Sequence, residues 1–234
     1  MLKINEIFDT VQGEAFYTGT PATFIRLQGC PVGCHWCDTK HTWSTGTEKL
    51  KIEIDEMLHK TKDSPKWSDV SEKEIVNIVT KLKPRHFVLT GGEPCSQDIF
   101  ELTRLLASVG SVQVETSGTH TINVYHKTWV TVSPKIDMMG GLNVLNSALI
   151  RANELKMPIN SHNDVKNLQK LVKNVNYGQL VWLQPVSQKQ DNTDLCVKTA
   201  MDNNWRISIQ TVSYTHLRAH ETEADLVCRL LLEK

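Results

Sequence analysis

Short apolar runs alternate with amphipathic stretches along the chain, and this pattern predicts a series of strands and helices. Runs rich in β-branched and aromatic residues predict six strands, at residues 23–28, 86–90, 112–116, 129–133, 179–184 and 205–210, with a weaker seventh at 154–159. Apolar residues at helical spacing predict helices at residues 71–83, 98–108, 142–152, 164–173 and 191–203. Strands that alternate with helices indicate an α/β fold with a mainly parallel sheet, either open or curled into a barrel.

The first predicted helix has a clear start. Ser71 and Glu74 stand just ahead of the apolar Ile75. The Ser71 hydroxyl is therefore expected to accept a hydrogen bond from the Glu74 N–H, while the Glu74 side chain reaches back. This capping box fixes where the helix begins.

Polar and turn-forming residues follow five of the predicted strands. The segments are Gln28-Gly29-Cys30, Thr90-Gly91-Gly92-Glu93-Pro94, Glu115-Thr116-Ser117-Gly118, Ser133-Pro134-Lys135 and Gln184-Pro185. Any one of them is most simply a turn. Because ligands bind at the carboxyl ends of parallel strands, which meet at one edge of the sheet, five such segments together indicate a site there.

The charge balance and composition exclude several classes of protein. The 234 residues carry 26 Lys and Arg against 26 Asp and Glu, so no field of the whole molecule attracts nucleic acid or anionic lipid, and we expect neither as a partner. The hydrophobic share of 40% is ordinary for a globular protein. No apolar run reaches the about 18 residues of a membrane span, and the first residues lack the layout of a signal peptide. A cytoplasmic location is expected.

Three of the six cysteines, Cys30, Cys34 and Cys37, lie close together in a loop directly after a predicted strand. A structural zinc site usually has four closed ligands, so zinc would have to recruit a nearby histidine or a distant cysteine. An iron–sulfur cluster held by three thiolates instead keeps one iron open for a ligand. We favour the open cluster, with zinc as the main alternative and a chance grouping of buried cysteines as the third.

The motifs resemble a known superfamily. The spacing Cys30-x3-Cys34-x2-Cys37, followed by Gly91-Gly92-Glu93 after a strand, resembles the radical S-adenosylmethionine (SAM) superfamily. In that superfamily SAM chelates the open iron, and one-electron reduction then cleaves its sulfonium and releases a 5′-deoxyadenosyl radical. Within it, the chain resembles the 7-carboxy-7-deazaguanine synthase family from about residue 5 to residue 210. The resembling segments are NEIFDTVQGEAFYTGTPATFIRLQGCPVGCHWCDTKHTW, LTGGEPC, ETSGTH, TWVTVSPK, LQPVSQK and NWRISIQT. The resemblance implies a partial (βα) barrel of the radical SAM type.

The resemblance also implies which residues hold the cofactors and the substrate. The ligands of a [4Fe-4S] cluster would be Cys30, Cys34 and Cys37, and Thr39 would help to hold Mg²⁺. The residues expected to bind SAM are Gly92, Glu93, Ser117, Ser133, Pro134, Lys135 and Gln184. The residues expected to bind the substrate are Val11, Gln12, Gly13, Arg26 and Thr90.

Three of these assignments have a physical reason in the sequence. Gly92 has no side chain, so its backbone could approach SAM closely, although a tight turn would need glycine as well. Lys135 could offer its ammonium to the SAM carboxylate. Arg26 shares one face of its strand with Phe24 and Gln28, where a guanidinium needs an anion. That anion is the substrate carboxylate or, without it, the partner in an internal salt bridge.

The reaction implied by the resemblance is a radical ring contraction that belongs to queuosine biosynthesis and so to tRNA modification. In this lyase reaction 6-carboxy-5,6,7,8-tetrahydropterin loses ammonia and becomes 7-carboxy-7-deazaguanine. A flavodoxin or ferredoxin would donate the electron, and a homodimer is expected. Two alternatives remain open: a radical SAM activating enzyme that acts on a partner protein, and a zinc-stapled binding module.

The expected organisation is one radical SAM domain over residues 1–211, followed by an anomalous tail. Residues from 41 to about 69 fit poorly as a simple crossover, and we expect a partly helical insertion beside the site. Residues 212–234 depart from the family pattern and resemble translated sequencing-adaptor sequence, so our hypothesis is that this tail is not native. The alternative is an amphipathic helix over residues 221–233.

Overall fold

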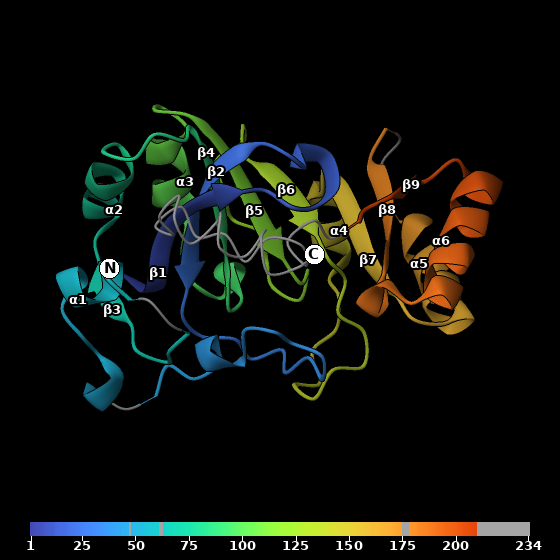
Figure 1. The fold of residues 1–234 in the computed structure, drawn as a ribbon, viewed down its shortest axis with the longest axis horizontal. Helices are drawn as coiled ribbons and strands as arrows, with labels where there is room; N and C mark the ends of the chain where they lie inside the picture. The colour runs from blue at the N-terminus through green and yellow to red at the C-terminus, as the bar shows by residue number, and fades with distance from the viewer. Residues whose placement is uncertain (47, 61–62, 175–177, 210–234) are drawn as a thin grey trace, which may run out of the picture.

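The computed structural model describes residues 1–46, 48–60, 63–174 and 178–209 (Figure 1). The strands of this part of the chain are β1 (Leu2–Val11), β2 (Pro21–Leu27), β3 (Ser68–Val70), β4 (His86–Gly91), β5 (Ser111–Thr116), β6 (Trp129–Val132), β7 (Glu154–Ile159), β8 (Leu180–Pro185) and β9 (Arg206–Ile207). Its α-helices are α1 (Ile54–Leu58), α2 (Glu72–Val79), α3 (Phe100–Leu106), α4 (Asn146–Arg151), α5 (His162–Val172) and α6 (Gln190–Asn203).

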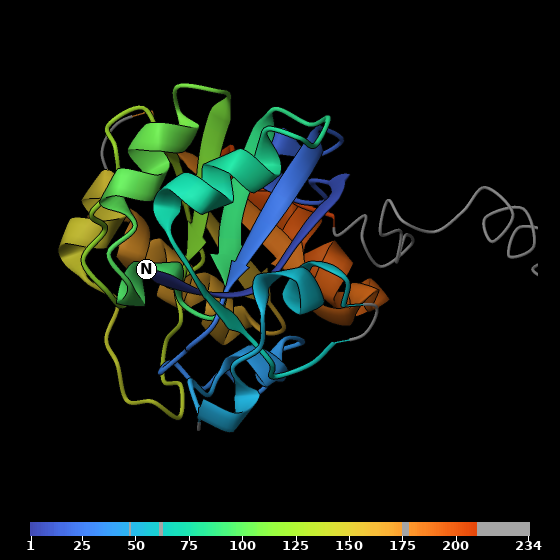
Figure 2. The same ribbon diagram turned by 90° about the vertical axis from the view of Figure 1, so that its left-hand side faces the viewer.

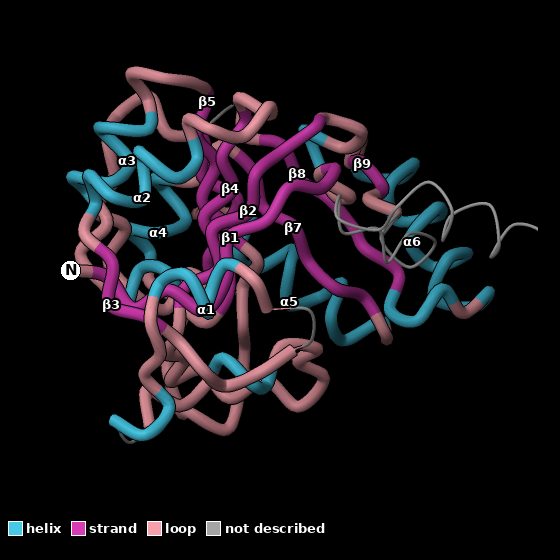
Figure 3. The backbone as a smooth tube through the Cα atoms, turned by 60° about the vertical axis from the view of Figure 1, so that its left-hand side comes forward, coloured by secondary structure: helices cyan, strands magenta, loops and turns pink. Residues whose placement is uncertain are grey.

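The described strands form one sheet that is mainly parallel and open. Its order is β3-β1-β2-β4-β5-β6-β7-β8-β9, so β3 and β9 are the two edges. β1 runs antiparallel to both β2 and β3, whereas every neighbouring pair from β2 to β9 is parallel. Helices precede β4, β5, β7, β8 and β9, and Figure 3 shows them distributed around the strands. The predicted α/β fold, a partial barrel of mainly parallel strands, is confirmed.

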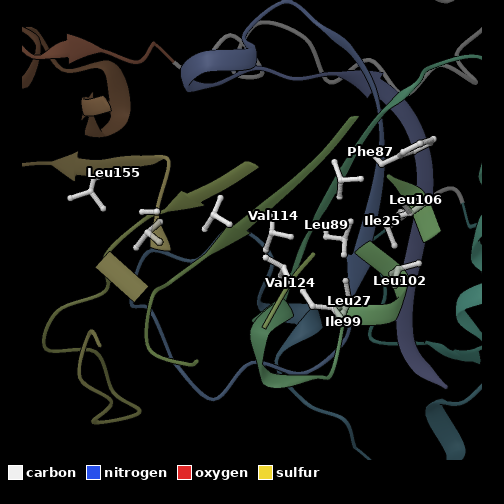
Figure 4. Close-up of a cluster of buried hydrophobic side chains, with 14 of the residues drawn as sticks. Ile25, Leu27, Phe87, Leu89, Ile99, Leu102, Leu106, Val114, Val124 and Leu155 are labelled. Atoms are coloured by element: carbon white, nitrogen blue, oxygen red, sulfur yellow. The ribbon is translucent and has the colours of Figure 1, made fainter. Parts of the chain in front are cut away.

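One face of the parallel strands is apolar and forms the core. Alternate residues of a strand point to opposite faces, so a period of two places one apolar row on this side. Burying one such side chain stabilises the fold by about 1.5–3 kcal/mol. Figure 4 shows part of this core, in which the row packs against residues of α3. The buried residues of the row are Ile25, Leu27, Phe87, Leu89, Val112, Val114, Val130, Val132, Leu155, Met157, Ile159, Val181 and Leu183.

The loop after β1 reaches from one side of the sheet to the other. It contains the short 3-10 helix η1 (Ala15–Tyr17) and lies at the amino-terminal ends of the parallel strands (Figure 1). The Phe16 ring stacks on the Trp129 ring at the start of β6, with centroids 4.5 Å apart. The Ala15 N–H donates to the Ser208 Oγ, just beyond β9, at 2.9 Å. This loop therefore brings the residues after β1 over the inside of the curved sheet.

The clearest difference from the sequence prediction is β1, which the periodicity does not reveal. Its pairing with β2 shifts register between Ile4 and Glu6. Such a bulge interrupts the alternation of inward and outward residues, so the hydrophobic pattern loses its period of two. The short edge strand β3 also escapes the pattern. The weakly predicted seventh strand is confirmed as β7, which pairs with β8 along its whole length.

The predicted ends of helices and strands differ from the structure more than their predicted types do. α4 begins at residue 146 rather than 142 because Leu145 is extended, with φ −81° and ψ 137°, and its N–H donates to the Gly118 O at 2.8 Å. α2 begins as predicted, since the Ser71 Oγ accepts a hydrogen bond from the Glu74 N–H at 3.3 Å. The predicted strand at 205–210 shortens to β9, and residue 210 lies outside the described residues.

The described residues of the segment 41–69 lie along the end of the sheet where β2 finishes, and Figure 2 shows them below most of the strands. It is partly helical, as expected, with 3-10 turns η2 (Lys40–Thr42) and η3 (Glu48–Leu50) followed by α1. The Asn5 Nδ2 in β1 donates to the Ser64 O at 2.9 Å and to the Lys66 O at 3.1 Å. The domain boundaries stay a prediction, and the tail at 212–234 lies outside the described residues. None of the described helices has the length and apolar character of a membrane span.

Candidate active site

The cysteine loop follows β2 and is held in place from two sides. On one side the Gly29 N–H donates to the Thr42 O at 2.7 Å. On the other the Gly140 N–H donates to the Val32 O at 3.0 Å. A Cβ on Gly140 would lie only 2.0 Å from the Pro31 O, so this close approach requires glycine. The loop is therefore clamped between the insertion and the segment after β6.

The three thiols of this loop lie together in a small apolar cluster. Cys34 is buried, and Cys30 and Cys37 are half-buried, beside Val32 and Met138. In the described part of the chain, the three sulfurs are not all within 4.8 Å of one another. Around one tetrahedral zinc ion, with Zn–S bonds of about 2.3 Å, they would lie about 3.8 Å apart. The thiols are therefore not arranged as they would be around one zinc ion.

The surroundings of Cys30 and Cys34 disfavour free thiolates. Burial raises the pKa of Cys30 to about 11. Burial also raises the pKa of Cys34, although the Lys135 ammonium opposes this rise. The Trp43 Nε1 donates to the Cys37 Sγ at 3.3 Å. Iron binds thiolates, so a bound cluster would add positive charge that stabilises them, and N–H···S hydrogen bonds would tune its potential.

The turn of residues 91–93 after β4 packs directly on the cysteine loop. The Glu93 N–H donates to the Gly29 O at 2.8 Å. A Cβ on Gly92 would lie 2.1 Å from the same oxygen. The contact between these two backbone segments alone therefore requires glycine at position 92. This agrees with the interpretation that a tight turn needs Gly92. Its approach to SAM stays a prediction.

The Glu93 carboxylate is buried and ties this turn to the end of β5. It accepts hydrogen bonds from the Cys95 N–H at 2.9 Å and the Thr116 Oγ1 at 2.6 Å. It also accepts from the Ser117 N–H at 2.8 Å and from the Ser117 hydroxyl. Four protein donors occupy its lone pairs. Two of the residues predicted to bind SAM, Glu93 and Ser117, are thus brought together.

Lys135, just after β6, places an ammonium beside the cysteine loop. Its Nζ donates to the Ser133 O at 3.1 Å and to the Ser133 Oγ at 2.5 Å. Burial lowers the pKa of Lys135, and the Cys34 thiol opposes that change. Pro134 between them is buried. The structure therefore groups the three residues of this strand end with the thiols.

The second face of the parallel strands is polar, and much of it is buried. Lys156 of β7 is 4% exposed, and its Nζ donates to Glu14 and, at 2.8 Å, to the Glu115 Oε2. The Gln184 Nε2 donates to the Glu14 Oε1 at 3.1 Å. These contacts join β5, β7 and β8 to the loop after β1, so they line the inside of the curved sheet. Sequence analysis assigned no role to Glu14 or Lys156 and named Glu115 only within a strand-end segment. For Glu115 and Lys156, polar residues at every second position of predicted strands were the available signal.

Two of the predicted substrate residues lie side by side, and a third lies elsewhere. Arg26 and Thr90 are partners in the register of β2 and β4. The Arg26 Nε donates to the Glu6 Oε1 at 2.7 Å, so the internal salt bridge is present in the structure. Val11 instead pairs with Pro21 at the start of β2 and is 49% exposed. It lies at the opposite end of β2 from the cysteine loop.

Gln12 and Gly13 are buried at the inner face. The Gln12 Nε2 donates to the Gln113 Oε1 at 3.1 Å and to the Glu115 Oε1 at 3.0 Å. The Gln12 Oε1 accepts a hydrogen bond from the Glu14 N–H at 3.2 Å. Both hydrogens of this side-chain amide are therefore used within the protein.

Comparison with known proteins relates this arrangement to a family. The model of the radical SAM superfamily matches residues 24–137. The 7-carboxy-7-deazaguanine synthase of Escherichia coli (strain K12) is 48% identical over 219 residues, which are 92% of this chain and 98% of that protein. The chain belongs to the 7-carboxy-7-deazaguanine synthase family.

Further members and a solved structure agree with this assignment. The 7-carboxy-7-deazaguanine synthase of Buchnera aphidicola subsp. Schizaphis graminum (strain Sg) is 42% identical over 220 residues, 92% of this chain and 98% of that protein. The crystal structure of QueE from Escherichia coli superposes with a TM-score of 0.86 at 48% identity and covers 89% of this chain and 93% of that one. The recognition of the family from the sequence is confirmed.

As a radical SAM member of this synthase family, the chain uses a [4Fe-4S] cluster and SAM, and its residues fit both groups. The three thiols supply the soft ligands that the cluster needs. The Gln184 Oε1 is buried and has no hydrogen-bond partner among the described residues. An unpaired buried acceptor costs about 1–3 kcal/mol, which a donor from a bound ligand would remove. The zinc-stapled module loses its support, since the family to which the chain belongs uses the cluster.

Thr39, the predicted Mg²⁺ ligand of this synthase, lies just before η2. Its Oγ1 is 3.6 Å from the Cys37 Sγ. One hydroxyl supplies a single position of the six that Mg²⁺ requires. The magnesium role of Thr39 therefore stays a prediction.

Proposed function

We propose that this chain converts 6-carboxy-5,6,7,8-tetrahydropterin into 7-carboxy-7-deazaguanine with loss of ammonia, as a lyase of queuosine biosynthesis. The observation that carries the proposal is the polar inner face of the sheet, which lies beside three clustered thiols. A bicyclic substrate with a carboxylate, an amino group and ring N–H groups needs such a face, because every polar group that it buries requires a partner.

The chain's own part in the reaction is to position the substrate and to exclude water. When bound, the cluster and SAM supply the radical that removes a hydrogen atom from the substrate. The buried side chains of β5, β7 and β8 form the wall against which the ring would be held. Their mutual hydrogen bonds fix this wall before any ligand arrives, so little reorganisation is needed on binding.

Arg26 is the residue that we assign to the substrate carboxylate. The Arg26 Nε donates to the Glu6 Oε1 at 2.7 Å. The two terminal nitrogens of the guanidinium then form a fork of donors that can face a ligand. A carboxylate pairs with such a fork through two parallel hydrogen bonds. Glu6 therefore orients the fork rather than competing for it. Thr90, the register partner of Arg26, and Gln12 with Gly13 complete the proposed contacts.

For SAM we assign the residues at the carboxyl ends of β4, β5, β6 and β8. Lys135 would exchange its contact with Ser133 for the SAM carboxylate, a charge-assisted partner. The unpaired Gln184 Oε1 would accept a donor of the cofactor. The turn at Gly92 and Glu93, with Ser117 and Pro134, would shape the rest of this pocket.

The magnesium ion and the partners are further parts of the proposal. Thr39 would supply one oxygen to Mg²⁺, and substrate oxygens and waters would supply the others. A flavodoxin or ferredoxin would approach at the cysteine loop, where Trp36 is 54% exposed. We propose a homodimer that works in the cytoplasm, which light scattering in solution and fractionation of cells would test.

The decisive experiment is an anaerobic incubation of the reconstituted protein with SAM, Mg²⁺, a chemical reductant and carboxytetrahydropterin. Mass spectrometry should find 7-carboxy-7-deazaguanine and released ammonia. The matched control is Cys34→Ala, which should yield neither. If wild-type protein with a full cluster cleaves SAM but leaves the pterin unchanged, the proposed substrate is wrong, and the activating-enzyme alternative becomes the better explanation.

A further inference from the structure

Glu154, the first residue of β7, is a fully buried carboxylate to which the proposed function gives no role. It accepts hydrogen bonds from the Trp129 Nε1 at 3.1 Å, the Thr131 Oγ1 at 2.6 Å and the Trp182 Nε1 at 2.7 Å. An indole N–H can only donate, so each carboxyl oxygen accepts one indole hydrogen, and Oε1 accepts the Thr131 hydroxyl as well. Burial raises the pKa of Glu154, and these donors and Lys156 oppose that rise.

The direction of each following hydrogen bond is then determined. Thr131 has one hydroxyl hydrogen, which it gives to Glu154, so it can only accept from the Gln113 Nε2 at 3.0 Å. The Gln113 Nε2 also donates to the Glu115 Oε1 at 3.3 Å. A flipped amide would bring the Gln113 oxygen against two oxygens without a hydrogen between them. Gln113 therefore has one orientation.

The same reasoning determines the orientation of Gln12 at the inner face. The Gln113 Oε1 accepts from the His86 Nε2 at 3.0 Å and from the Gln12 Nε2 at 3.1 Å. The other Nε2 hydrogen of Gln12 goes to Glu115, and its Oε1 keeps one lone pair after accepting from the Glu14 N–H. Gln12 is 2% exposed and Gln113 is fully buried, so water does not compete in this chain.

We infer that Glu154 is a positioning residue: acting through Thr131 and Gln113, and together with Glu115, which accepts from both amides, it fixes Gln12 as a hydrogen-bond acceptor toward the ligand. The inference rests on the proposed function, because it takes Gln12 as a substrate contact. The site then selects a ligand that carries an N–H at this position, such as the amino group of a pterin. It rejects a ligand with a carbonyl there, since two acceptors would be buried face to face.

Substrate preference tests the inference, with Thr131→Val as the variant and Thr131→Ser as its matched control. Valine has the shape of threonine without the hydroxyl, whereas serine keeps the hydroxyl. The holoenzyme is assayed with 6-carboxytetrahydropterin and with its 2-oxo counterpart, 6-carboxytetrahydrolumazine. The preference for the pterin in kcat/KM should fall by about tenfold or more in Thr131→Val and persist in Thr131→Ser. An undiminished preference in Thr131→Val would overturn the inference.

A second measurement needs no turnover. In full-length protein labelled with ¹⁵N-glutamine, the Gln12 amide hydrogens should exchange with D₂O about 100-fold more slowly than in the unfolded chain. This protection should be lost in Thr131→Val and kept in Thr131→Ser, with Gln12→Glu used to assign the signal. Unprotected Gln12 hydrogens in wild-type protein would refute the inference. If wild-type holoenzyme converts neither compound, the proposed function fails, and the exchange data still decide the inference.

Discussion

Replacing Gly92 with alanine tests whether the turn after β4 is shaped by the cysteine loop or by the cofactor. The new Cβ would lie 2.1 Å from the Gly29 O and 2.6 Å from the Gly29 C. Both are atoms of a clamped backbone rather than the end of a flexible side chain. Ordinary contacts of this kind are about 3.5–4 Å, so the two segments must separate by more than about 1 Å.

The structure gives the size of the expected effect. Separation breaks the hydrogen bonds from the Gly92 N–H to the Leu27 O, at 2.9 Å, and from the Glu93 N–H to the Gly29 O, at 2.8 Å. Each contributes about 1 kcal/mol, and overpacking adds about 1–3 kcal/mol. The free energy of unfolding should therefore fall by about 3–5 kcal/mol in Gly92→Ala, a large part of the stability of an ordinary domain.

Urea unfolding of the apoprotein, followed by circular dichroism under reducing conditions, measures this loss without any cofactor. The matched control is Gly19→Ala, because Gly19 has φ +88° and nothing within 4 Å of the added Cβ. That variant should show only the backbone strain of about 1–2 kcal/mol. The reasoning is refuted if Gly92→Ala unfolds like wild type and loses only SAM affinity.

Three further changes are predicted. Cys34→Ala should lose both bound iron and turnover, measured by iron analysis and product mass, and turnover without a cluster would contradict the mechanism. Lys156→Met should lower the free energy of unfolding by about 3–5 kcal/mol in urea, because it leaves the Glu14 and Glu115 carboxylates without their shared buried cation. A change below about 1 kcal/mol would argue against this ion pair. Burial lowers the pKa of His86 from 6.5, so the unfolded chain binds a proton more readily, and wild-type stability should fall as the pH drops below about 6.5. His86→Gln should lose less stability than wild type between about pH 7 and about pH 5. Identical slopes of the free energy of unfolding against pH in the two proteins would exclude this contribution of His86.

The sequence predicts the parallel strands and the cysteine loop because their signals are local. The apolar row of each strand repeats at every second residue, and the thiols of Cys30, Cys34 and Cys37 stand in one loop. The segments that end β4, β5 and β6 are likewise marked by their own glycine, serine and proline residues. The structure groups these segments with the thiols, as the common edge of a parallel sheet requires.

Other features depend on which distant segments pair, and the sequence alone does not determine this. The anion beside Arg26 is Glu6, a contact that exists only because β1 pairs antiparallel with β2 after a register shift. The requirement for Gly92 comes from Gly29, far away in the chain. Lys156, the cation that Glu14 and Glu115 share, lies on β7. Each of these facts follows from strand order rather than from a motif.

The loop after β1 has a consequence for how the protein is made. Glu14 bonds to Lys156 and Gln184, which are 142 and 170 residues away, and Ala15 bonds to a residue 193 positions away. Contacts across such long separations form late in folding. The cysteine loop, by contrast, finds its first backbone partners in the insertion that follows it. The contacts between the cysteine loop and the insertion therefore close short stretches of chain, whereas the wall of the substrate chamber needs both ends of the described chain before it can form.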